Sequence, residues 1–179
     1  MRPEPPASKI PERISWAVEQ LGLRSTDTVL EVGTGGGHAL ALVGAKLTRG
    51  SLTAIDRSAL QVKAARARNR DAVRAGRLRI EQLSLDDAKA ALGQRFGKVL
   101  AVNVNAFWTY PDSSLSSLKR LLLPTGRAYL VYEPPSLARA RALGQSLPER
   151  LRSRGWRVER TATIGFARSH GVCVVARPP

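Results

Sequence analysis

The chain has 179 residues with 43% hydrophobic side chains, which is enough for one sizeable core and is typical of a soluble globular protein. Its 29 lysines and arginines outnumber 14 acidic residues, and the net charge of +15 favours contact with nucleic acid, acidic lipid or an anionic substrate. No apolar run approaches the roughly 20 residues of a membrane-spanning helix, and the first ten residues contain no apolar signal region, so we expect a cytoplasmic protein without a membrane anchor.

Cysteine and histidine are too scarce for a disulfide framework or a metal site. Cys173 is the one cysteine and lies in an apolar stretch, and the two histidines are far apart in the sequence. We therefore expect a protein of a reducing compartment that binds no metal. A single domain is expected over residues 1–179, of which residues 1–11 form a proline-rich N-terminal arm.

The hydrophobic pattern predicts helices and strands that alternate along the chain. Apolar residues recur with the helical period after Pro11 and predict an amphipathic helix over residues 12–22. Later helices are predicted over residues 37–47, 56–75, 86–92, 112–123 and 136–154, the last with a break near Pro148. Strands are predicted over residues 28–32, 51–55, 78–83, 98–103, 127–132, 157–166 and 171–177.

This alternation predicts an α/β fold, because a helix between two strands allows them to run parallel with helices on both faces of the sheet. The connection through Ser169, His170 and Gly171 is short. The last two strands should therefore form an antiparallel hairpin at one end of the sheet.

A glycine-rich segment joins the first strand to the next helix, and residues 31–37 read Glu-Val-Gly-Thr-Gly-Gly-Gly. Glycines at 33, 35 and 37 let the backbone approach a ligand that a Cβ atom would keep away. Asp56 ends the second strand, at the distance from this loop where an acid can bind both ribose hydroxyls of a nucleoside cofactor. Together the two features predict a nucleotide site, which neither predicts alone.

With these features the chain resembles class I S-adenosylmethionine-dependent methyltransferases over residues 12–177. The segments that carry the resemblance are residues 29–37, 55–58, 102–105 and 121–127 and the closing hairpin. The resemblance implies a Rossmann-like three-layer sandwich with a seven-stranded, mostly parallel sheet in the order 3-2-1-4-5-7-6, in which strand 7 is antiparallel. It also implies S-adenosyl-L-methionine as the cofactor.

The resemblance further implies which residues contact the cofactor. The glycine loop should pass under the methionine part, Asp56 should bind the ribose, and Arg57 should lie beside the adenine. Asn103 ends the fourth strand and should lie next to the transferable methyl group. The full set of expected cofactor-binding residues is Glu31, Gly33, Thr34, Gly35, Gly37, Asp56, Arg57, Ser84, Leu85, Asp86 and Asn103.

An acceptor pocket is expected after the fourth strand, because ligands of open parallel sheets bind at the carboxyl ends of the strands. Asn105 could offer a hydrogen bond, and Phe107, Trp108 and Tyr110 could form the walls. The alternative is that these rings form a small core beneath a loop. Asn103 and Asn105 are the candidate catalytic residues, although the reaction needs alignment of the reactants more than acid–base chemistry.

Three other interpretations stay open at this point. An RNA or DNA methyltransferase would explain the charge, with Arg66, Arg70, Arg74 and Arg77 as a phosphate-binding stripe, or these arginines form a solvated helix face. A regulatory module could bind the cofactor without turnover. A nicotinamide dehydrogenase fits less well, because its fingerprint needs glycine where His38 stands. We expect a small-molecule acceptor as the partner, and a monomer or homodimer.

Overall fold

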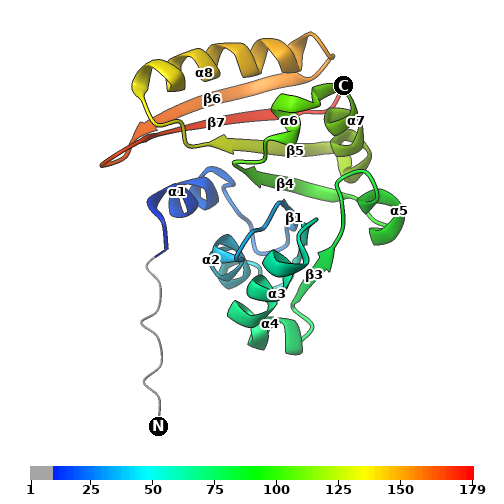
Figure 1. Cartoon of the computed structure of the whole chain (residues 1–179). Helices are drawn as coiled ribbons and strands as arrows, with labels where there is room; N and C mark the ends of the chain where they lie inside the picture. Colours follow the sequence, from blue (N-terminus) through cyan, green and yellow to red (C-terminus); the bar gives the residue numbers. More distant parts are fainter. Residues whose placement is uncertain (1–9) are drawn as a thin grey trace.

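The computed structural model describes residues 10–179 and contains a seven-stranded sheet in the order β3-β2-β1-β4-β5-β7-β6 (Figure 1). The strands are β1 (Thr28–Val32), β2 (Ser51–Asp56), β3 (Leu78–Gln82), β4 (Phe96–Val102), β5 (Leu122–Tyr132), β6 (Arg157–Gly165) and β7 (His170–Arg177). Strands β1 to β5 pair in parallel, and β7 is antiparallel to β5 and β6. The predicted order and the antiparallel β7 are confirmed. Residues 1–9 of the predicted proline-rich arm lie outside the described residues.

The helices that connect these strands are α1 (Glu12–Gln20), α2 (His38–Lys46), α3 (Ala59–Arg68), α4 (Arg70–Arg74), α5 (Ala88–Leu92), α6 (Ala106–Thr109), α7 (Pro111–Leu121) and α8 (Leu137–Arg152). Between residues 10 and 179, no helix combines the length and the apolar character needed to cross a membrane.

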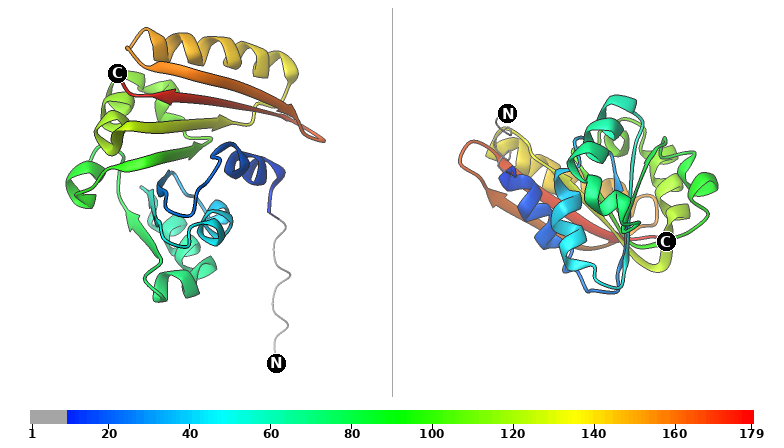
Figure 2. Two further views of the ribbon diagram at one scale, coloured as in Figure 1. Left: turned by 180° about the vertical axis from the view of Figure 1, so that it is seen from behind. Right: turned by 90° about the horizontal axis from the view of Figure 1, so that it is seen from below.

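Neighbouring residues of the central strands point to opposite faces of the sheet and fill two separate cores. Leu30 on β1 packs in the core that α7 and α8 cover, whereas Val29 packs in the core that α1, α2 and α3 cover. The same alternation separates Leu130 from Val131 on β5. Figure 2 shows α1 and α2 on one side of the sheet and α7 on the other. Burial on both faces explains why these strands are continuous apolar runs in the sequence.

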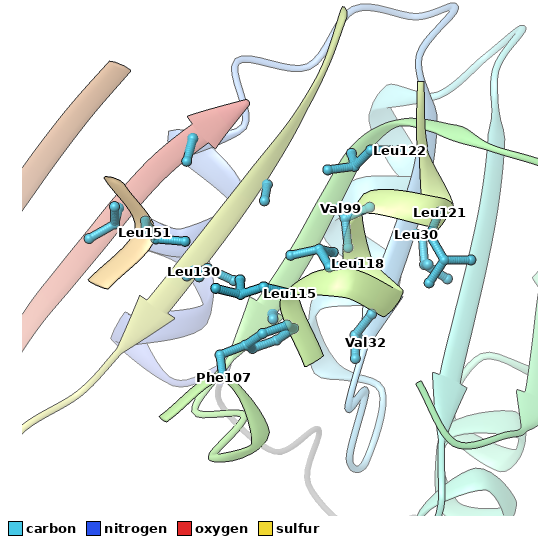
Figure 3. Packing of buried hydrophobic residues seen from close by; sticks show 14 of the residues in the cluster. Leu30, Val32, Val99, Phe107, Leu115, Leu118, Leu121, Leu122, Leu130 and Leu151 are labelled. Atoms are coloured by element: carbon cyan, nitrogen blue, oxygen red, sulfur yellow. The ribbon is translucent and has the colours of Figure 1, made fainter. Parts of the chain in front are cut away.

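The core beneath α7 also contains α6, which the sequence did not predict (Figure 3). Phe107 of α6 and Leu118 of α7 are fully buried there, and Leu115 is nearly so. Such side chains fix the loop after β4 against the sheet, because truncating a buried leucine costs about 2–5 kcal/mol.

The predicted continuous helix over residues 56–75 is wrong, because the chain breaks at Asn69 into α3 and α4. Asn69 has φ −111° and ψ 26°, outside the helical region. Its buried side-chain amide donates to the carbonyl oxygens of Ala65 at 2.9 Å and Gly37 at 3.0 Å. The break therefore ties α3 to the glycine loop, and an asparagine side chain that bonds the backbone competes with regular helix.

Two further predictions are also wrong, one at the boundary between α7 and β5 and one within α8. Helix α7 ends at Leu121, and β5 already begins at Leu122, which pairs with Phe96 across a register shift in β4. This bulge accommodates the extra residues of β5. Helix α8 continues through Pro148 without the predicted break, because Pro148 is itself buried and Leu147 is fully packed in the core. Packing outweighs the hydrogen bond that proline cannot donate.

Candidate functional site

A cavity of about 420 Å³ opens at the carboxyl ends of β1, β2, β3 and β4. This is the edge where open parallel sheets bind their ligands. The residues that line it are Val32, Gly33, Ile55, Asp56, Arg57, Leu83, Leu85, Val102, Asn103, Val104, Asn105, Ala106, Thr109 and Tyr110. The cavity thus combines a carboxylate, two asparagine amides and apolar walls.

A second cavity of about 160 Å³ adjoins the first. Gly33, Val102 and Asn103 line both cavities, so the two form one site that is divided at these residues. The smaller cavity is also lined by Arg13, Ile14, Glu31, Thr34, Gly35, Gly36, His38 and Ala39. Arg13 and Glu31 supply the ionisable side chains of the smaller cavity beside His38, whereas Asp56 and Arg57 supply those of the larger cavity.

Glycine is required at two positions of the loop for different reasons. Gly33 has φ +70°, and a Cβ atom there would lie 2.7 Å from Cγ2 of Val104. Gly37 has φ +73°, and its Cβ would lie 2.9 Å from Cα of Ala65 in α3. Gly33 thus lets the loop approach the segment after β4. Gly37 instead lets α2 begin against α3, and it lines neither cavity.

The carboxylate of Asp56 is held in place by backbone donors. Its Oδ2 accepts a hydrogen bond from the N–H of Gly35 at 2.9 Å, and its Oδ1 accepts one from the N–H of Ser58 at 2.9 Å. A carboxylate oxygen can accept more than one hydrogen bond. Asp56 therefore fixes the glycine loop and still has acceptor capacity for ligand hydroxyls at the wall of the larger cavity.

Glu31 places a buried carboxyl group at the smaller cavity, with only 5% of the residue exposed. Its pKa is raised to about 7, chiefly by burial; a hydrogen bond from Thr34 opposes the rise, and the charge of Asp56 contributes to it. That bond joins Oγ1 of Thr34 to Oε2 of Glu31 at 2.7 Å. Glu31 consequently changes charge near neutral pH.

Asn103 is held between the ends of β4 and β5. Its φ of +54° lies in the left-handed region, which is uncommon for a residue other than glycine and concentrates at functional sites. Its N–H donates to the carbonyl of Val131, and its Oδ1 accepts from the N–H of Glu133, both at 2.8 Å. These bonds fix the Asn103 amide at the junction of the two cavities.

The structure separates the aromatic residues that were expected to form one acceptor wall. Phe107 is fully buried in the main core beneath α7, so its predicted substrate contact is wrong, and it does not belong to a separate small core either (Figure 3). Trp108 lines neither cavity and stacks on the guanidinium of Arg150, 4.6 Å from the ring centroid. Asn105 and the exposed Tyr110 do line the larger cavity.

Among the three residues expected near the adenine after β3, only Leu85 lines the larger cavity. Ser84 donates from Oγ to Oδ2 of Asp87, and Asp86 accepts from Oγ of Ser117, each at 2.6 Å. The polar side chains of Ser84 and Asp86 thus hold the segment before α5 in place, whereas Leu85 faces the cavity.

Arg13 and His38 line the smaller cavity, although the sequence analysis assigned neither to the cofactor site. Arg13 comes from α1 and pairs with Glu133, 120 residues away, at 3.0 Å between Nη1 and Oε2. Burial, together with the charges of Arg68 and Arg13, lowers the pKa of His38. Arg13 and Glu133 are so far apart in the sequence that no local pattern predicts their contact. In the part of the chain that the structure describes, no cluster of three or more His, Cys, Asp or Glu residues could hold a metal ion.

Comparison with known proteins gives matches that include most of the residues lining the two cavities. A family described as "Methyltransferase domain" matches residues 30–128, more than half of the chain. The chain is 28% identical over 119 residues to an uncharacterized methyltransferase, YdaC, of Bacillus subtilis (strain 168). That match covers 66% of this chain and 63% of YdaC, so it spans less than two thirds of the relative's length.

Solved structures share the fold at low sequence identity. A SAM-dependent methyltransferase from Aquifex aeolicus superposes with a TM-score of 0.70 and 18% identity, over 90% of this chain and 88% of that one. Magnesium protoporphyrin IX methyltransferase from Synechocystis PCC 6803, solved with bound SAM, superposes with a TM-score of 0.65 and 17% identity, over 93% and 76%. At such identities the likeness concerns the fold alone.

Proposed function

Because this chain belongs to the methyltransferase domain family, we propose that it transfers a methyl group from S-adenosylmethionine to a small-molecule acceptor. Its cofactor is S-adenosylmethionine, which supplies an electrophilic methyl group on a positively charged sulfur. The acceptor, a cytoplasmic location and action as one domain are parts of the proposal.

The observation that carries the proposal is the divided cavity at the carboxyl edge of the sheet. The larger part offers Asp56 for ribose hydroxyls and Leu83 and Leu85 for an apolar ring. The smaller part offers Arg13 and Glu31, which suit the charged groups of the methionine end. Gly33 has no side chain at the junction of the two parts, so a ligand can approach the backbone there. Side chains of this chain therefore fit a nucleoside at one end and an amino acid at the other.

Asn103 is the residue that we propose for alignment at the reacting centre. It stands where the two parts of the cavity meet, and its amide is fixed by the N–H of Glu133. Fixed alignment of reactants can supply roughly 7–11 kcal/mol of a barrier. The role of Asn103 is accordingly to orient rather than to exchange a proton.

Part of the basic surface supports a small molecule rather than a nucleic acid as the acceptor. Arg66 donates to the carbonyl of Ile80, and Arg154 donates to Asp112. Arg160 donates to Oε1 of Gln20 at 2.6 Å. Each of these three guanidinium groups makes two or more hydrogen bonds within the protein, which leaves fewer N–H groups for phosphate contacts.

Binding and transfer can be tested in two steps. Calorimetry with S-adenosylhomocysteine, the demethylated product, should show binding by the wild type and at least about 10-fold weaker binding by Asp56→Ala, because ribose contacts to a charged group are lost. The exposed Asp71 on α4 provides the matched control, Asp71→Ala.

The acceptor is then sought with methyl-labelled S-adenosylmethionine, supplied with either a small-molecule cell extract or total RNA. Label in the small-molecule fraction supports the proposal. Label that enters RNA alone, or no label in either fraction despite cofactor binding, refutes the small-molecule acceptor and favours the nucleic-acid or regulatory interpretation.

A further inference from the structure

We propose that Arg13 of α1 binds the carboxylate of the cofactor's methionine part, and that Glu133 positions Arg13 for this contact. The inference rests on the proposed function and assigns a recognition role to residues outside the glycine loop and the strand ends. It makes α1, which precedes the sheet in the sequence, part of the cofactor site.

The geometry of Arg13 supports this role. Its side chain lines the smaller cavity together with Glu31 and the glycine loop. Nη1 donates to Oε2 of Glu133 at 3.0 Å, and Oε1 of Glu133 accepts from Oγ of Ser169 at 2.7 Å. Glu133 follows β5, and Ser169 belongs to the β6–β7 turn. Glu133 therefore fixes the guanidinium from the end of β5, and Ser169 in turn holds Glu133.

Arg13 has donors to spare for a ligand. A guanidinium carries five N–H groups in a fixed fork, and within residues 10–179 the Arg13 side chain makes one hydrogen bond, to Glu133. A carboxylate can be bound by two parallel N–H groups of the same fork. Arg13 can thus hold Glu133 and a ligand carboxylate at once, and no ion pair has to break.

The charges around the smaller cavity match an amino acid. Arg13 is close enough to His38 to lower the pKa of that imidazole, as Arg68 does, although burial is the larger cause. The positive charge of the smaller cavity therefore comes from Arg13, because the lowered pKa keeps the His38 imidazole toward its neutral form. The Glu31 carboxyl lines the same cavity and can accept a hydrogen bond. A positive guanidinium and an accepting carboxyl group suit the carboxylate and the ammonium of a zwitterion.

The test compares two ligands that differ only at the amino-acid end. S-adenosylhomocysteine carries the amino acid, whereas methylthioadenosine has the same nucleoside and sulfur without it. By calorimetry, Arg13→Gln should weaken binding of S-adenosylhomocysteine by about 10-fold or more and change binding of methylthioadenosine by less than about 2-fold. Arg74→Gln, on the exposed end of α4, is the charge-matched control and should change neither.

Two further variants separate recognition from folding. Arg13→Lys keeps a point charge and should recover part of the lost affinity. Glu133→Gln keeps the guanidinium but loosens it, and should weaken S-adenosylhomocysteine selectively by a few-fold. Equal weakening of both ligands by Arg13→Gln, or no weakening of either, overturns the inference. A wild type that binds neither ligand overturns the proposed function itself.

Discussion

Glu31 gives the protein a titratable group inside its core. Burial raises the pKa of this carboxyl from its usual 4.5 to about 7. The folded chain therefore binds the proton more tightly than the unfolded chain does. The resulting stability is complete below about pH 4.5 and is lost as the pH rises through about 7, by up to about 3 kcal/mol from this group.

Replacing Glu31 with glutamine should remove this pH dependence, because glutamine keeps the shape and cannot ionise. His38 acts in the opposite direction, since burial lowers its pKa. The quantity to measure is thus the difference in unfolding free energy between wild type and Glu31→Gln, by urea denaturation at pH 5 and pH 8. We expect the variant to gain relative to wild type at pH 8. A difference that does not change with pH would show that Glu31 stays in one charge state.

A substitution at Gly33 should also lower the stability of the protein. Alanine at this position must adopt φ +70° and place Cβ 2.7 Å from Cγ2 of Val104. The left-handed backbone costs about 1–2 kcal/mol, and displacement of Val104 adds to that cost. We expect Gly33→Ala to lose about 2–3 kcal/mol of unfolding free energy and to weaken cofactor binding.

Gly36→Ala is the matched control in the same loop. A Cβ atom at Gly36 would meet His38 at an ordinary 3.7 Å, without a left-handed backbone. Its unfolding free energy in denaturant should stay within about 1 kcal/mol of wild type. Equal losses in the two variants would mean that the loop tolerates no side chain anywhere, and the argument from Val104 would fail.

Between α3 and α4 a single side chain decides where the helix stops. Asn69 is buried and bonds to the carbonyl oxygens of Ala65 and Gly37. In Asn69→Ala both bonds are lost and the buried carbonyl of Gly37 loses a partner, which should cost about 2 kcal/mol or more in urea denaturation. The exposed neighbour Arg70 supplies the control, Arg70→Ala, with a change below about 0.5 kcal/mol. A stable Asn69→Ala protein would assign the helix break to another cause.

The same break shows what sequence alone can and cannot predict about elements. Strands buried on both faces are apolar runs, so their positions and, through the resemblance, their order were predictable. The break at Asn69 depends on Gly37, 32 residues away, and leaves no periodic signal. The start of β5 depends likewise on pairing with Phe96 across a bulge. Boundaries set by distant partners are the ones the sequence missed.

The residues of the candidate site likewise fall into those that the sequence predicts and those that it does not. Gly33 and Asp56 were predictable because Gly33 directly follows β1 and Asp56 ends β2, and adjacent parallel strands bring such positions to one edge. Phe107 and Tyr110 belong to a four-residue helix and its end, too short for periodicity to show which ring faces the core. Arg13 enters the site through its contact with Glu133 on another element. Contacts between elements, rather than motifs, place such residues.

Across the whole molecule, the net charge of +15 predicts weak, non-specific attraction to nucleic acid. If the acceptor is a small molecule, this attraction is not coupled to the cofactor site. Binding of a labelled single-stranded RNA, followed by fluorescence anisotropy, should then weaken steeply between about 50 and 200 mM salt. It should also be independent of the RNA sequence.

The effect of RNA on the affinity for S-adenosylhomocysteine distinguishes RNA that is the methyl acceptor from RNA that binds elsewhere on the surface. Any effect of one ligand on the affinity of another is reciprocal, and we expect RNA that enters the site beside the cofactor to change binding of S-adenosylhomocysteine through direct contact. We expect the dissociation constant of S-adenosylhomocysteine to be the same with and without saturating RNA at low salt. Polyphosphate serves as the control for charge alone. A several-fold change with RNA but not with polyphosphate would place RNA at the methyl group and replace the small molecule as the acceptor.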